Sequence, residues 1–208
     1  VTLGADGDFS YEALVARYNA DLANNLGNLL SRVATVVASK CGGIGPAPAP
    51  AGGEGEDENR IARCAGEATG RATQAWARCA PHEALEAAML LVHETNHELE
   101  VNEPWKLPPG PEVEAVLGDA LEAIRIIAIL VSPAMPRVAQ EIWERIGLDG
   151  RVDEPGRGGP AGGLSWGVYP GGLTVTKGEP LFPRRRAEEV AEAEEPEEAG
   201  AGALPDGA

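Results

Sequence analysis

Aromatic residues are scarce in this chain, at 4% of 208 residues, and cysteine and histidine each occur only three times. The cysteines, Cys41, Cys64 and Cys79, are odd in number and lack CxxC spacing, which counts against a zinc ribbon and against a complete disulfide framework. We therefore expect reduced thiols. The 43% hydrophobic content, carried mainly by aliphatic residues, supports a globular body built from helices.

Long apolar runs are also absent. The longest one spans residues 126–131, far short of the roughly 20 residues that a membrane-spanning helix needs. The sequence shows no secretory signal. These absences predict a soluble, cytoplasmic protein without a membrane partner.

Positive charge is in deficit, with a formal net charge of -16. Residues 187–208 contain eight acidic residues and no Lys or Arg, so residues 1–186 carry 17 basic against 25 acidic residues, a net charge of -8. DNA is therefore not an expected partner, and any phosphate contact must be local. The cluster Arg184 to Arg186 is open to two interpretations, phosphate contact or solvation, of which we favour solvation. Composition predicts that residues 187–208 form a disordered acidic tail.

Residues 10–37 predict one long amphipathic helix, with Ser10 as its N-cap. Its polar face presents Asn24, Asn28 and Arg32 at intervals of one helical turn. The buried face is expected to consist of apolar residues three and four apart, namely Leu14, Leu22, Leu26, Leu29, Leu30, Val33 and Val37.

Four further helices are predicted from apolar periodicity, Pro at helix starts and Gly at helix stops. Short turns between them imply an all-α antiparallel bundle of about five helices over residues 10–148. Residues 41–58, rich in Gly, Pro and Ala, are expected to be an exposed linker, and residues 149–186 an irregular Gly/Pro-rich strap. The four helices span about residues 59–79, 81–99, 113–130 and 138–146, and the third helix should bury Leu85, Met89, Leu90 and Val92.

His93, Glu94 and His97 match HExxH, in which two histidines one helical turn apart bind zinc and the glutamate acts as a general base. No flanking pattern marks a third ligand, although several glutamates, Glu122 among them, lie at a suitable interval downstream. We favour half-exposed polar residues of a bundle and keep a zinc peptidase as the alternative.

A second constellation combines Pro104 and Trp105 with Asn96 upstream. A Pro-Trp pair at a helix end can plug a core, or it can offer a rigid indole face on which an unpaired base stacks. In the second case Asn28 and Arg32 suit reading of a base edge, because Asn both donates and accepts and Arg donates in a fixed fork.

Four ordered blocks resemble the C-terminal helical anticodon-binding domain of bacterial methionyl-tRNA synthetases. They are DGDFSYEALVARYNADLANNLGNLLSRV at 6–33, TNHELEVNEPWKL at 95–107, ALEAIRIIAILVSPAMPRVAQEIWERIGL at 120–148, and GEPLFPR at 178–184. The resemblance thus runs from about residue 6 to 148 and resumes near the end of the chain.

The resemblance implies that the partner is the anticodon loop of tRNA(Met), with anticodon CAU. Trp105 would stack on an anticodon base, while Asn28 and Arg32 would read the first position, cytosine. Pro104 would support the stacking platform, Asn96 would lie in the site on the same helix end, and an acidic residue at Glu100 would disfavour wrong anticodons.

The family's catalytic half, a Rossmann-type domain with HIGH-like and KMSKS-like motifs, is not in this sequence. ATP and Mg would belong to that half, so this chain is not expected to activate methionine alone and needs no cofactor of its own. Residues 1–9 would be the lead-in from that N-terminal catalytic domain. An alternative is a helical protein-interaction remnant that does not bind tRNA.

Overall fold

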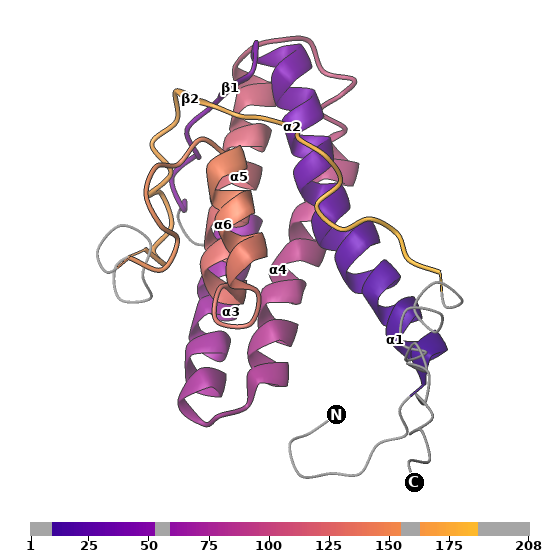
Figure 1. Ribbon diagram of the computed structural model, residues 1–208. Coiled ribbons are helices and arrows are strands. Elements are labelled where there is room, and N and C mark those ends of the chain that lie inside the picture. The colour runs from indigo at the N-terminus through magenta and orange to yellow at the C-terminus, as the bar shows by residue number, and fades with distance from the viewer. Residues whose placement is uncertain (1–9, 53–58, 155–162, 187–208) are drawn as a thin grey trace, which may run out of the picture.

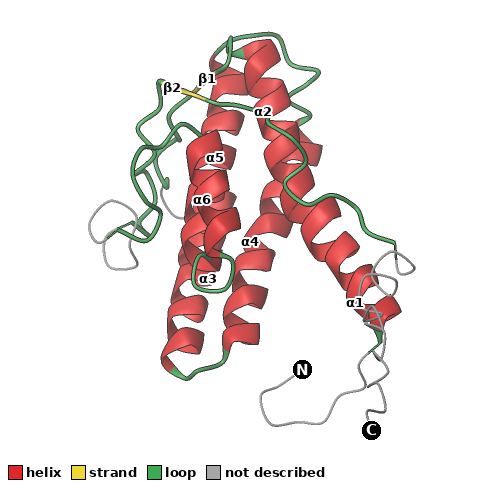
Figure 2. Ribbon diagram, in the orientation of Figure 1, coloured by secondary structure: helices red, strands yellow, loops and turns green. Residues whose placement is uncertain are grey.

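The computed structural model describes residues 10–52, 59–154 and 163–186. Nearly all of its regular structure is helical, and a two-stranded ladder of two residues per strand is the exception (Figure 2). The elements are α1 (Tyr11–Arg17), η1 (Tyr18–Gly27), α2 (Asn28–Lys40), β1 (Ile44–Gly45), α3 (Arg60–Ala77), α4 (Pro81–Asn102), α5 (Pro111–Val131), α6 (Pro136–Arg145) and β2 (Leu173–Thr174).

The first helix is continuous from Tyr11 to Lys40, and its middle part, η1, is wound as a π-helix (Figure 1). Ser10 caps it as predicted, accepting a hydrogen bond from the amide of Ala13 at 3.2 Å. The predicted buried stripe is confirmed from Leu26 onward, but Leu14 is 49% exposed. The prediction failed at Leu14 because the N-terminal end of this helix diverges from the bundle (Figure 1).

The remaining helices pack as an antiparallel bundle around α5, which is buried almost continuously from Leu117 to Val131. Over the described residues this confirms the predicted all-α bundle of about five helices, with α1, η1 and α2 counted as one. The predicted apolar face of the third helix, α4, is wrong at Leu90, which is 44% exposed. The buried face of α4, which packs against α3 and α5, lies on another side of the helix and consists of Ala84, Ala87, Ala88, Leu91, Val92, Thr95 and Leu99.

Part of the predicted exposed linker contacts the rest of the fold, although Ile44, Ala47 and residues 50–52 are exposed. Ile44 pairs with Thr174 and Gly45 with Leu173 in an antiparallel ladder. Farther along, Gly118 on α5 permits the close approach of the Ala47 backbone, since a Cβ at Gly118 would lie 2.1 Å from the Ala47 carbonyl oxygen. Residues 44–48 are therefore fixed against β2 and α5. Residues 53–58 lie outside the described residues, as do the predicted lead-in at 1–9 and the predicted acidic tail at 187–208.

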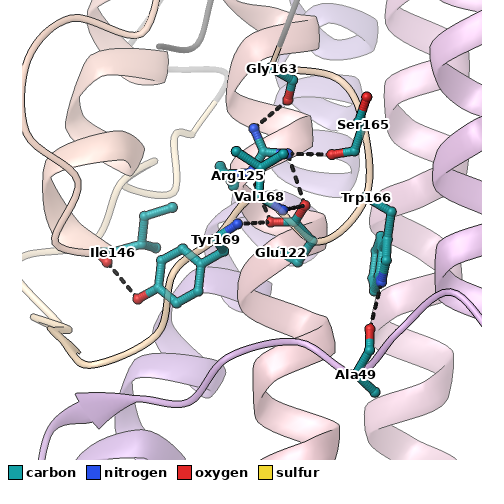
Figure 3. A network of polar contacts seen from close by, with 9 residues as sticks. All are labelled: Ala49, Glu122, Arg125, Ile146, Gly163, Ser165, Trp166, Val168 and Tyr169. Carbon is teal, nitrogen blue, oxygen red and sulfur yellow. Dashed lines mark hydrogen bonds and ion pairs between the residues drawn. The ribbon is translucent and has the colours of Figure 1, made fainter.

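The C-terminal strap, residues 163–186, is held by a buried ion pair on α5 (Figure 3). Glu122 and Arg125 have side chains 0% and 1% exposed and lie 2.8 Å apart. Each also bonds the strap backbone: Arg125 donates to the carbonyls of Gly163 and Ser165, and Glu122 accepts from the amides of Val168 and Tyr169. Glu122 is thus a structural residue, which removes it as a zinc ligand.

Among the residues described, no helix combines the length and apolar character needed to cross a membrane.

Candidate nucleic-acid interface

The first helix and the C-terminal end of α4 meet at Arg32. The Arg32 guanidinium nitrogen Nη1 lies 3.5 Å from Asn96 Oδ1 and 3.5 Å from Glu100 Oε1. Its Cζ atom lies 5.0 Å from the centroid of the Trp105 ring. The fold therefore gathers four of the six predicted site residues, drawn from segments far apart in the sequence.

The turn after α4 presents Trp105. Glu103 ends the helix in the left-handed region, at φ 41°, and this reverses the chain direction. Pro104 is buried beneath the turn, whereas Trp105 is 39% exposed. Lys40, at the end of α2, donates to the carbonyl of Leu107 and ties the turn to the first helix. The indole is thus neither a core plug nor a free side chain, because part of its surface is open to solvent.

Asn96 joins α4 to the first helix. Its Nδ2 lies 3.4 Å from the carbonyl oxygen of Asn25 and 3.2 Å from that of Val92, and its Oδ1 faces Arg32. These contacts use both ends of the amide within the protein. Asn96 is therefore placed to orient Arg32.

Asn28 lies one helical turn before Arg32 and is exposed. Within the described part of the chain its side chain makes no hydrogen bond, so its donor and its acceptor face solvent. It borders a groove between the first helix and the strap.

The HExxH residues do not form a metal site. His93 and His97 are exposed, and Glu94 faces Arg60 at 3.6 Å. Over the described ranges no group of three or more His, Cys, Asp or Glu side chains could hold a metal ion. The zinc peptidase alternative is therefore not supported, and the motif is explained as polar positions on α4.

Sequence reasoning left the strap out of the site. The structure places Arg184 beside the polar face of the first helix, where its Nη2 donates to Asn24 Oδ1 at 2.9 Å. The GEPLFPR block that ends at Arg184 was the available signal. Periodicity could not have paired these residues, which are 160 positions apart.

No family model matches this chain. Among curated proteins, it is 34% identical over 191 residues to a methionine–tRNA ligase of Streptomyces coelicolor, covering 88% of this chain and 35% of that protein. A methionine–tRNA ligase of Deinococcus radiodurans is 34% identical over 199 residues, covering 93% of this chain and 28% of that protein.

Among solved structures, the apo form of Mycobacterium tuberculosis methionyl-tRNA synthetase superposes with a TM-score of 0.73 at 31% identity, covering 89% of this chain and 37% of that chain. The same enzyme in complex with methionyl-adenylate gives a TM-score of 0.72 at 30% identity. The chain thus spans about a third of the length of the relatives it matches.

Proposed function

This chain is homologous to a part of the methionine–tRNA ligases, and from that premise we propose that it binds tRNA(Met) and reads the CAU anticodon. The observation that carries the proposal is the Arg32–Trp105 pair, in which a cation and a partly open indole face lie together, 5.0 Å apart. Because the chain carries a net negative charge, phosphate attraction alone would bind RNA weakly. A cation beside an indole face suits an unpaired base, which can stack on the ring.

In this proposal Trp105 stacks on an anticodon base, with the buried Pro104 holding the turn beneath it. Stacking of a base on an aromatic side chain is worth about 1–3 kcal/mol and does not depend on base identity. A second group must therefore supply selectivity. Arg32 and Asn28 have donors and acceptors that suit the edge of cytosine.

Glu100 has two effects on this site. Its carboxylate, 67% exposed and 3.5 Å from Arg32 Nη1, keeps the guanidinium over Trp105 in the free protein. It also places a negative charge beside the base-reading fork, which disfavours a base that presents acceptors there. Asn96, which lies on α4 as Glu100 does, orients Arg32 on the first helix.

The chemistry of the whole ligases, activation of methionine with ATP and Mg and its transfer to tRNA, is proposed to reside in the part of the relatives that this chain does not cover. This chain then serves as the recognition module of that enzyme. The partners expected for it are the anticodon loop of tRNA(Met) and the catalytic part of the ligase.

The test is a titration of the purified chain with a fluorescent anticodon stem-loop carrying CAU, at near-physiological salt. A matched stem-loop differs only in its first anticodon base. We expect tighter binding to CAU. Equal affinity for the two loops would overturn anticodon reading, and absence of binding to either would favour the interaction remnant.

A further inference from the structure

A groove of about 690 Å³ lies between the first helix and the strap. One wall presents Asn24, Asn28 and Ser31, and the other presents Lys177 and Arg184. None of the residues that line it is acidic. In a chain with a formal charge of -16, a groove with two cations and no carboxylate is a local exception.

The groove has a fixed form because the strap is anchored along the first helix. Phe182 is 8% exposed and its ring meets Tyr18 edge-on, with the ring centroids 6.0 Å apart. Asn19 bonds the strap backbone twice, donating to the carbonyl of Arg185 at 2.8 Å and accepting from its amide at 3.0 Å. The wall that carries Arg184 is therefore part of the folded structure.

The two cations keep their charge available. Arg184 donates to the neutral amide of Asn24 rather than to a carboxylate. Lys177 is exposed, and its ammonium group forms no ion pair with any residue that the structure describes. A phosphate that entered the groove would meet two cations that form no ion pair among the residues described.

The groove shares Asn28 with the proposed anticodon site. Asn28 lines it, and Ser31 lies directly before Arg32 in the chain. The wall formed by Asn24 and Gly27 belongs to η1, and π-helical segments are frequent at functional sites. A strand whose base is read by Asn28 would have its neighbouring nucleotides beside this groove.

We infer that the groove holds the sugar–phosphate backbone of single-stranded RNA next to the base that is read, with Lys177 and Arg184 contacting phosphates. The amide groups of Asn24 and Asn28 would then face the sugars or bases. This inference rests on the proposed function for the identity of the RNA, but it concerns a different wall and a different kind of contact. It assigns the cation at Arg184 to phosphate binding rather than to solvation.

The test compares Lys177→Ala, Arg184→Ala and the double variant with the unmodified chain. The probes are the CAU stem-loop and its first-base variant, titrated over a series of salt concentrations. Each substitution should weaken binding by about two- to five-fold, equally for both stem-loops. The slope of log K against log salt should become shallower by about 0.7 for each single-strand phosphate that the variant no longer neutralises.

Arg71→Ala and Arg137→Ala, alone and combined, are the matched controls. They remove exposed cations from α3 and α6, and should leave affinity and salt slope close to those of the unmodified chain. All four arginine and lysine positions are exposed, so unfolding curves should agree among the variants.

Wild-type affinity and salt slope in the Lys177 and Arg184 variants, or equal losses in the controls, would overturn the inference while leaving anticodon reading intact. Failure of anticodon reading alone would give a different result. If the unmodified chain binds both stem-loops equally and the groove variants bind both more weakly, the backbone contacts stand and anticodon reading fails. No binding of either stem-loop by the unmodified chain would overturn both.

Discussion

The guanidinium of Arg32 lies 5.0 Å above the ring of Trp105 and joins the first helix to the turn that follows α4. Cation–π pairs of this kind contribute about 0.5–1 kcal/mol at exposed sites. The other contacts of Arg32, to Asn96 and Glu100, are both 3.5 Å long, near the upper limit for a hydrogen bond. Arg32 is thus positioned in the free protein by contacts weak enough to be exchanged for a ligand.

Trp105→Ala should weaken binding of the CAU stem-loop by about 1–3 kcal/mol, because the variant has no stacking surface at this position. The fold should persist, since the side chain is already 39% exposed. Fluorescence anisotropy gives the affinity and thermal unfolding reports on the fold. Val101→Ala, at a 59% exposed position on α4, is the control. A Trp105→Ala variant that binds as tightly as the unmodified chain would refute the stacking role.

Arg32→Lys should relax discrimination at the first anticodon base while keeping the charge, because an ammonium group lacks the fork that reads a base edge. If the bidentate contacts of DNA readout are a guide, the loss of discrimination is about 1–3 kcal/mol. The measurement is the ratio of affinities for the CAU and first-base-variant stem-loops. Equal losses for both loops would show instead that Arg32 contacts phosphate.

Glu122→Ala should lower the free energy of unfolding by about 3–5 kcal/mol, because it leaves Arg125 as a buried, uncompensated charge. The pair is 0% and 1% exposed and bonds the strap backbone (Figure 3). The double variant Glu122→Leu, Arg125→Met should be less destabilised than the single one, although it too lacks the hydrogen bonds to the strap backbone. Urea denaturation gives both values, and additive losses in the double variant would contradict this account.

Cys79→Gly should raise the free energy of unfolding by about 1 kcal/mol. Cys79 follows the end of α3 at φ 55°, a conformation that costs an L-residue about 1–2 kcal/mol and glycine little. The turn is closed by hydrogen bonds from the amide of Ala80 to the Ala75 carbonyl and from that of Cys79 to the Trp76 carbonyl. Ala77→Gly, within α3, should instead destabilise by about 0.5–1 kcal/mol. Destabilisation by both would remove the strain argument.

The pH dependence of stability should carry a contribution from Asp119. Burial raises the pKa of this carboxyl above its ordinary value of 3.8, despite hydrogen bonds from the Ala49 amide and the Asn59 side chain. A raised folded-state pKa means that the native state holds the proton longer than the unfolded state. Stability from this group is therefore present below pH 3.8 and declines as pH rises through the folded-state pKa.

The comparison for Asp119 is the pH slope of the free energy of unfolding in the unmodified chain and in Asp119→Asn. The asparagine variant should lack the decline, whatever its absolute stability. Parallel slopes would contradict the burial argument.

The sequence by itself determined the helices and where most of them begin, because those signals are local. Ser10 and Asn59 cap helices through their side chains, and Pro81 opens α4 as expected. Apolar residues three and four apart predicted α5, because helical periodicity is also a local signal. Arg32 and Trp105 were candidates from the spacing of the polar face and from the Pro-Trp pair, and the family resemblance assigned their roles.

Only the tertiary structure decided which of these local patterns became buried and which segments meet. Leu14 and Leu90 satisfy helical periodicity yet stay exposed, because burial requires a neighbouring element that the period does not specify. The pairing of Ile44 with Thr174 and the hydrogen bonds of Glu122 and Arg125 to the strap depend on contacts between distant segments. The entropy cost of closing such long loops is offset only when the whole chain is packed, so no local sequence signal predicts them.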